Sequence, residues 1–236
     1  MKVLILAAGF GTRVQHLTGG KPKALMPYKD GVLLDALIEQ FTASDEISLI
    51  TNALYRSQFE QWADGKDRKI LLIDNQVMSE SERKGALFDL ALALDHVGID
   101  EPMIVVGSDT IFDFSLAAFG EALARDHCSL VGVRKNPDLE DQKRRGVVQM
   151  DALGRITGFK EKPLSPKSDT AATALYGFMP EALRRLKPYL ADNQNIDAPG
   201  YFIQYLIDQV PMGAWWLPGP IIDFGHADAL SKSLMS

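Results

Sequence analysis

Short apolar runs alternate with helix-like stretches along the first half of the chain. The runs are rich in aliphatic and β-branched residues and predict buried strands at residues 3–8, 47–52, 69–74, 103–106 and 129–133. Between them, apolar residues recur at three- and four-residue spacings, which predicts helices at residues 31–42, 54–63, 85–97 and 114–125. This alternation indicates an α/β protein with a mixed, mainly parallel sheet between helices.

The pattern changes after about residue 136. Residues 146–150 and 155–160 flank a turn at residues 151–154 and predict a hairpin. The remaining expected elements are helices at 180–190 and 198–209, extended chain at 213–224 and a closing helix at 227–234. No linker or repeat interrupts the chain, so we expect one domain over residues 1–236, with halves 1–135 and 136–236.

Composition excludes several classes of protein. The 236 residues are 46% hydrophobic and 24% charged, as in ordinary globular proteins rather than disordered ones. A net charge of -6 argues against a nucleic-acid-binding surface, so an anionic ligand would need a local cationic cluster. The single cysteine, Cys128, excludes an intramolecular disulfide and fits a reducing compartment. The sequence shows neither a signal peptide nor an apolar run near the roughly 20 residues of a membrane helix, which predicts a cytoplasmic protein without membrane contact.

The first predicted strand leads into a loop of small residues, LAAGFGTR at positions 6–13. Small residues expose backbone N–H groups and allow close approach to phosphate oxygens, while Arg13, Lys21 and Lys23 add positive charge. The third glycine of a dinucleotide fingerprint is missing, and so is the Gly-Lys-Ser/Thr end of a P-loop. A tight turn without ligand is the alternative interpretation of these glycines.

Four ordered motifs carry a family resemblance. LAAGFGTR followed by KPKALMP resembles the signature of sugar-1-phosphate nucleotidyltransferases, in particular their short glucose-1-phosphate thymidylyltransferase-like members. VVGSDTIF at 105–112, GFKEKP at 158–163 and IIDFG at 221–225 are similar to later motifs of that family. The resemblance implies a single-domain Rossmann-like nucleotidyltransferase fold and an enzyme that makes an NDP-sugar and pyrophosphate from an NTP and a sugar 1-phosphate, with Mg²⁺.

The resemblance also implies roles for individual residues, with the nucleotide bound by residues 1–135 and the sugar phosphate by residues 136–236. The implied catalytic residues are Arg13 and Lys23, and the implied metal ligands are Asp109 and Asp223. Nucleotide binding is implied for Leu6, Ala8, Gly9, Gly11, Thr12, Arg13 and Gly85. Binding of the sugar phosphate is implied for Gly146, Glu161, Lys162 and Tyr176.

Several alternatives stay open at the level of sequence. Asp109 could cap the helix expected near Phe114, Asp223 could belong to a turn before Gly225, and Glu161 with Lys162 could form a solvated surface pair. The chain could instead be a cytidylyltransferase acting on a non-sugar phosphate such as phosphocholine, or an inactive nucleotide-sensing protein. Residues 81–84 depart from the family pattern that selects the base, so the base stays open, as do the sugar and any homo-oligomer.

Overall fold

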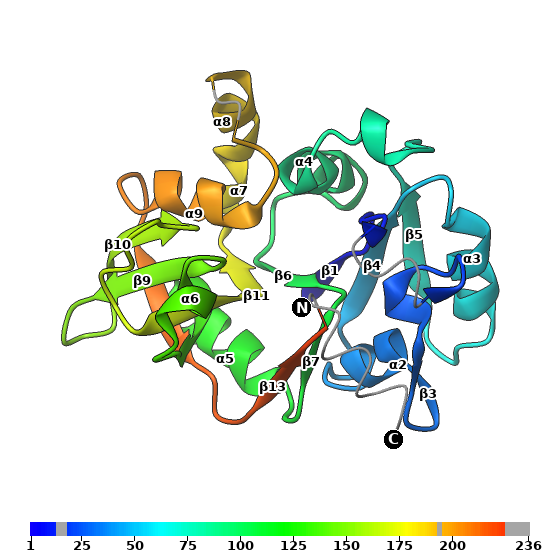
Figure 1. Ribbon diagram of the computed structural model, residues 1–236, viewed down its shortest axis with the longest axis horizontal. Coiled ribbons are helices and arrows are strands. Elements are labelled where there is room, and N and C mark those ends of the chain that lie inside the picture. The colour runs from blue at the N-terminus through cyan, green and yellow to red at the C-terminus, as the bar shows by residue number, and fades with distance from the viewer. Residues whose placement is uncertain (13–17, 193–194, 225–236) are drawn as a thin grey trace. The chain divides into compact units, whose positions relative to one another are not determined.

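The computed structural model describes residues 1–12, 18–192 and 195–224, and the closing helix expected at 227–234 lies outside this part (Figure 1). The chain forms two compact units, each assembled from separate stretches of sequence. Unit 1 comprises Met1–Arg83, Val106–Ala118 and Pro218–Ser236, and unit 2 comprises Lys84–Val105 and Phe119–Leu217. The expectation of one domain with halves 1–135 and 136–236 stays a prediction.

Unit 1 is built on three parallel strands, β1 (Lys2–Leu6), β4 (Glu46–Thr51) and β5 (Ile70–Asp74). Two helices cross over between them, α2 (Leu33–Ile38) and α3 (Arg56–Asp64), as the sequence predicts. Helix α2 is shorter than expected because its first predicted residues form the short strand β3 (Gly31–Val32), which pairs with β2 (Pro27–Tyr28). Ile5, Leu37 and Phe59 are fully buried, so the apolar faces of strands and helices make one core.

A separate antiparallel ladder in unit 1 joins β7 (Thr110–Phe112) to β13 (Ile221–Asp223). Strand β7 follows β6 (Met103–Gly107) after a short turn. The extended chain expected at 213–224 is therefore two strands, since β12 (Met212–Trp216) belongs to unit 2 and β13 to unit 1.

Unit 2 contains a mixed set of strands. Strands β8 (Ser129–Lys135), β9 (Gly146–Met150), β10 (Ile156–Glu161) and β11 (Thr170–Phe178) pair antiparallel in the order β10, β9, β11, β8, and β12 is parallel to β8. The predicted β9–β10 hairpin is confirmed. Together with the parallel strands of unit 1, this confirms the mixed α/β class.

The helices of unit 2 are α4 (Ala86–Val97), α5 (Ala117–Asp126, which begins in unit 1), α6 (Leu139–Gln142), α7 (Pro180–Arg184), α8 (Leu186–Asp192) and α9 (Pro199–Leu206). The single helix expected at 180–190 is two helices. Pro188 explains the break, because a proline inside one continuous helix removes a backbone hydrogen bond and clashes with the preceding turn, whereas it is tolerated in the first turn of α8. Among the described residues, no helix combines the length and apolar character that crossing a membrane requires.

Candidate active site

Hydrogen bonds of its backbone groups anchor the small-residue loop after β1 to residues of β4 and of the chain that follows it. The Ala7 amide donates to the carbonyl of Ile50 at 2.9 Å, which extends the β1–β4 ladder by one residue. The Ala8 carbonyl accepts a hydrogen bond from Asn52 Nδ2 at 3.0 Å, and the Phe10 carbonyl accepts one from the Tyr55 hydroxyl at 3.3 Å. A side chain added at Gly9 would meet no atom within 4 Å, so this part of the loop is held on one side and open on the other.

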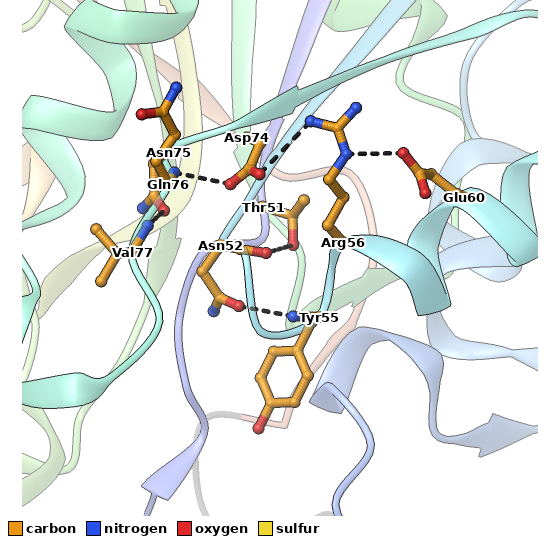
Figure 2. A network of polar contacts seen from close by, with 9 residues as sticks. All are labelled: Thr51, Asn52, Tyr55, Arg56, Glu60, Asp74, Asn75, Gln76 and Val77. Carbon is orange, nitrogen blue, oxygen red and sulfur yellow. Dashed lines mark hydrogen bonds and ion pairs between the residues drawn. The ribbon is translucent and has the colours of Figure 1, made fainter.

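The residues that hold the loop belong to a polar network at the carboxyl ends of β4 and β5, which Figure 2 shows. Asn52 is fully buried, and its Oδ1 accepts from the Tyr55 amide at 3.0 Å. Arg56 links Glu60 of α3 to Asp74 at the end of β5. Asn52 and Tyr55 were not singled out in the sequence, although a polar residue directly after a buried strand is a recognisable signal for this sheet edge.

Lys23 and Asp109 form an ion pair in unit 1, and Asp223 lies on the strand that pairs with the residues after Asp109. Lys23 begins a short 3₁₀ helix (Lys23–Leu25), and its Nζ lies 3.2 Å from Asp109 Oδ2. Asp109 occupies the turn before β7, and its carbonyl accepts from the Phe224 amide at 2.8 Å. In the adjoining ladder Asp223 is the partner of Thr110, so the backbone of Asp223 lies beside the residue that follows Asp109.

Asp109 does not cap the following helix. Helix α5 begins at Ala117, whose amide donates to Ser115 Oγ at 3.2 Å. The carboxylate of Asp109 instead forms the ion pair with Lys23. The exposed fraction of the side chain is 37% for Asp109 and 14% for Lys23. The helix-cap alternative for Asp109 is therefore wrong.

The two aspartates are chemically suited to a hard cation. Mg²⁺ prefers oxygen ligands and usually keeps waters and substrate phosphates beside one or two carboxylates. Within the part of the chain that the structure describes, no group of three or more His, Cys, Asp or Glu side chains could hold a metal without such help. Asp109 and Asp223 would therefore need phosphate and water oxygens to complete the coordination of Mg²⁺.

A second group of predicted residues lies in unit 2, at the end of the β9–β10 hairpin. Glu161 and Gly146 are direct cross-strand partners. A side chain at Gly146 would collide with the Phe159 ring, and one at Gly200 would collide with the Glu161 carboxylate. Burial raises the pKa of Glu161, the Lys162 charge lowers it and the Asp197 charge raises it again. Glu161 is thus no solvated surface residue, and the surface-pair alternative is wrong for it.

The backbone bends at Lys162, where φ is +46°. The Lys162 amide donates to the Arg145 carbonyl at 2.9 Å, and its Nζ lies 3.9 Å from Asp197 Oδ2. Adjacent residues of a straight strand point to opposite faces, but here Glu161 and Lys162 both approach the segment 197–200. Asp197 and Gly200 are thus further site candidates that sequence reasoning missed, because no motif marks them.

Gly85 contacts the same segment from the start of α4. Its φ is +105°, and a side chain there would lie 2.5 Å from the Ile196 carbonyl oxygen. The Leu87 amide donates to that oxygen at 3.0 Å. Residues 196–200 therefore join Gly85, an implied nucleotide residue, to Glu161 and Lys162, implied sugar-phosphate residues.

The remaining predicted residues are placed as follows. Tyr176 lies in β11 with its ring stacked on Phe178 at 6.0 Å, and burial followed by the Glu161 charge raises its pKa. Leu6 ends β1, Gly11 has φ +63° and Thr12 is exposed. Arg13 lies outside the described residues.

Residues 2–230 match the family model described as nucleotidyl transferase. The chain belongs to this nucleotidyl transferase family. This confirms the family expected from the four motifs.

Two named relatives and one solved structure show what the chain resembles in sequence and in fold. The chain is 31% identical over 189 residues to the mannose-1-phosphate guanylyltransferase catalytic subunit beta of Dictyostelium discoideum, covering 80% of this chain and 52% of that protein. It is 28% identical over 181 residues to a UTP–glucose-1-phosphate uridylyltransferase of Haloferax volcanii, covering 76% and 72%. A solved UDP-glucose pyrophosphorylase complexed with UDP-glucose superposes with a TM-score of 0.83 at 20% identity, covering 98% of this chain and 96% of that one, which confirms the fold. The chain spans about half the length of the first of these relatives.

Proposed function

We propose that the protein transfers a nucleotidyl group from an NTP to a sugar 1-phosphate in a Mg²⁺-dependent reaction that yields an NDP-sugar and pyrophosphate. The observation that carries this proposal is the Lys23–Asp109 ion pair, with Asp223 on the adjoining strand opposite Thr110. The relatives named above act on sugar 1-phosphates, which supports the same class of acceptor.

The chemistry needs positive charge rather than a covalent nucleophile. A phosphate oxygen of the sugar 1-phosphate attacks the α-phosphorus of the NTP, and the bond from that phosphorus to the oxygen of the leaving pyrophosphate breaks. Both reactants are anionic, so repulsion is the main obstacle. Asp109 and Asp223 would hold Mg²⁺, which when bound neutralises phosphate charge and orients the reacting oxygens.

The side chains of the protein supply the rest. Lys23, now paired with Asp109, would meet phosphate charge on the nucleotide, and Arg13 would meet the charge that builds on pyrophosphate. The backbone of residues 8–11 would line the triphosphate. Lys162 would bind the phosphate of the acceptor, and Glu161 would accept hydrogen bonds from its sugar hydroxyls.

The discriminating experiment is a matrix of four NTPs against several sugar 1-phosphates and phosphocholine, read by pyrophosphate release. We expect turnover with at least one sugar 1-phosphate and none with phosphocholine. Acceptance of phosphocholine with refusal of every sugar 1-phosphate would favour the cytidylyltransferase alternative. Absence of turnover throughout, with NTP binding retained, would favour the nucleotide-sensing one.

Substitutions at Glu161 and Lys162 should have divided effects. Lys162→Ala should raise KM for every phosphorylated acceptor, because it removes the cation that faces the phosphate. Glu161→Gln should impair sugar 1-phosphates that offer ring hydroxyls and leave the KM for NTP unchanged. Steady-state kinetics beside the exposed controls Lys143→Ala and Glu140→Gln measure both effects. Unchanged sugar 1-phosphate kinetics in Glu161→Gln would refute its role.

Glu161→Gln should also raise the free energy of unfolding at pH 7. Burial raises the pKa of Glu161 in the folded protein, so the ionised carboxylate opposes folding at neutral pH. As pH falls through the raised pKa, Glu161 becomes protonated and no longer opposes folding. The difference in free energy of unfolding between parent and variant should therefore shrink from pH 7 towards pH 4. Urea unfolding at both pH values checks the sign.

Asn52→Ala should weaken the loop after β1. The variant leaves the buried Ala8 carbonyl and Tyr55 amide without their side-chain partner, and each such loss costs about 1–3 kcal/mol. We therefore expect a lower thermal unfolding midpoint and a raised KM for NTP, with an unchanged KM for the acceptor. The exposed Gln61→Ala on α3 is the control. Equal changes in both KM values would show a general loss of structure instead.

A further inference from the structure

A hollow of about 720 Å³ lies in unit 2, beside the β9–β10 hairpin, the chain that follows it and the C-terminal part of α9. This volume is in the range of organic ligand sites, about 300–1,000 Å³. We name it the three-lysine pocket. Its lining residues are Val147, Gln149, Gly158, Phe159, Lys160, Lys162, Pro163, Leu164, Ser165, Lys167, Gln204, Ile207 and Asp208.

The three-lysine pocket differs from the predicted sugar-phosphate site. In the hairpin register Lys160 pairs with Val147 and Gly158 with Gln149, and these positions alternate with Glu161 and Gly146. The side chains of Lys160, Val147 and Gln149 therefore point away from the face of Glu161, from which Phe159 also reaches the pocket. Of the implied acceptor-binding residues, only Lys162 lines the pocket.

The charge of the pocket favours an anion. Lys160, Lys162 and Lys167 line it against a single carboxylate, that of Asp208. Lys160 and Lys167 are exposed, and neither has a carboxylate partner among the described residues. The chain as a whole carries a net charge of -6, so this excess of positive charge is a local property of the pocket.

Two further features of the pocket indicate which groups its ligand would carry besides the negative charge. Gln204 lines the pocket, and its buried Oε1 atom accepts no hydrogen bond within the described part of the chain, so a ligand N–H or O–H would satisfy it once the amide turns towards the pocket. Phe159 and Ile207 contribute apolar wall, and the Leu164 side chain is 90% exposed among the lining residues. An organic anion with an apolar ring would cover this surface, whereas a bare inorganic ion would not.

The pocket is also connected to the predicted acceptor site. Lys162 Nζ lies 3.9 Å from Asp197 Oδ2, which is a long ion pair. An anion in the pocket that binds this ammonium group more closely would draw it away from the predicted acceptor site. Helix α9 carries Gly200 against Glu161 and Gln204 in the pocket one turn later. We propose that the three-lysine pocket is an effector site for an organic anion bearing a ring and a hydrogen-bond donor, and that its occupant weakens binding of the sugar 1-phosphate through Lys162. The second half of this proposal rests on the proposed function.

The probe for the site is 8-anilinonaphthalene-1-sulfonate, which has one sulfonate, fused rings and an N–H donor. Its fluorescence is titrated against the full chain with saturating NTP present. We expect saturable binding that Lys160→Ala combined with Lys167→Ala weakens about tenfold, while Lys143→Ala, which removes an exposed lysine outside the pocket, leaves it unchanged. An unchanged thermal midpoint in the double variant excludes dye binding to unfolded chain.

The outcomes separate the two halves of the proposal. Equal dye affinity in parent and double variant, or a dye affinity that is lower with saturating NTP than without it, overturns the site. A rise in the KM for sugar 1-phosphate with dye in the parent, absent from the double variant, supports the coupling, and no rise overturns it. If the parent turns over no sugar 1-phosphate, the proposed function fails, while the fluorescence titration still decides whether the site exists.

Discussion

Asp109→Asn should lower kcat by more than about 10²-fold while the fold stays intact. Loss of an outer partner of a metal ligand already costs about 10–100-fold, and Asp109 is proposed as a ligand itself. An amide is a much weaker ligand for Mg²⁺ than a carboxylate. The hydrogen bond from the Phe224 amide to the Asp109 carbonyl is untouched by the substitution, and an amide oxygen can still accept from Lys23 Nζ, so circular dichroism and thermal unfolding should stay close to those of the parent.

The matched control is Asp113→Asn. Asp113 lies just beyond β7 in the same unit and is exposed, so the substitution removes the same charge from a nearby position of the same unit. Its kcat should stay within about twofold of the parent, the effect of an exposed charge being small. Turnover by Asp109→Asn within a few-fold of the parent at saturating Mg²⁺ would refute the metal assignment.

Gly85→Ala should destabilise the protein by about 3 kcal/mol or more. With φ at +105°, Gly85 occupies backbone space that costs other residues about 1–3 kcal/mol, and its new methyl group would overlap the Ile196 carbonyl. That neighbour is backbone, so it cannot rotate away as a side chain would. For a chain of this size the thermal midpoint should fall by roughly 6–12 °C.

Gly120→Ala is the control for Gly85→Ala. Gly120 lies inside α5, and an added methyl group would meet Ile104 at an ordinary 3.7 Å. Because alanine favours helix over glycine by about 1 kcal/mol, the midpoint should be unchanged or higher. A fall of similar size in both variants would mean that the contact of Gly85 with residues 196–197 is not the cause.

Local pattern was enough to predict most elements of the fold. Strands β1 and β4 are aliphatic runs that are buried along most of their length, and the 151–154 turn separates two short apolar segments, so both signals are contained within a few residues. Strand β11 was missed because its first residues, Thr-Ala-Ala-Thr-Ala, are small and lack the bulky β-branched pattern. Tertiary packing, with buried positions along nearly its whole length, makes it a strand.

The candidate site likewise contains residues that local motifs predict and residues that only the structure identifies. Lys23, Asp109 and Asp223 are predictable because motifs mark each of them, and the structure pairs Lys23 with Asp109 and places Asp223 opposite Thr110. Asn52, Asp197 and Gly200 act through long-range contacts with Ala8, Lys162 and Glu161. Such contacts leave no local trace in one sequence. The roles of all these residues in binding and catalysis stay predictions until the variants are measured.

The discontinuous make-up of unit 1 has a consequence for folding kinetics. Thr110 and Asp223 pair across an intervening stretch that contains most of unit 2, so the β7–β13 ladder closes a very long loop. Contacts of high sequence separation form late, since the entropy of loop closure must be overcome before they contribute. In refolding from urea, helical signal and the local β9–β10 hairpin should therefore recover before Asp223 comes to lie opposite Thr110, and competence to bind a divalent cation should be among the last properties to return.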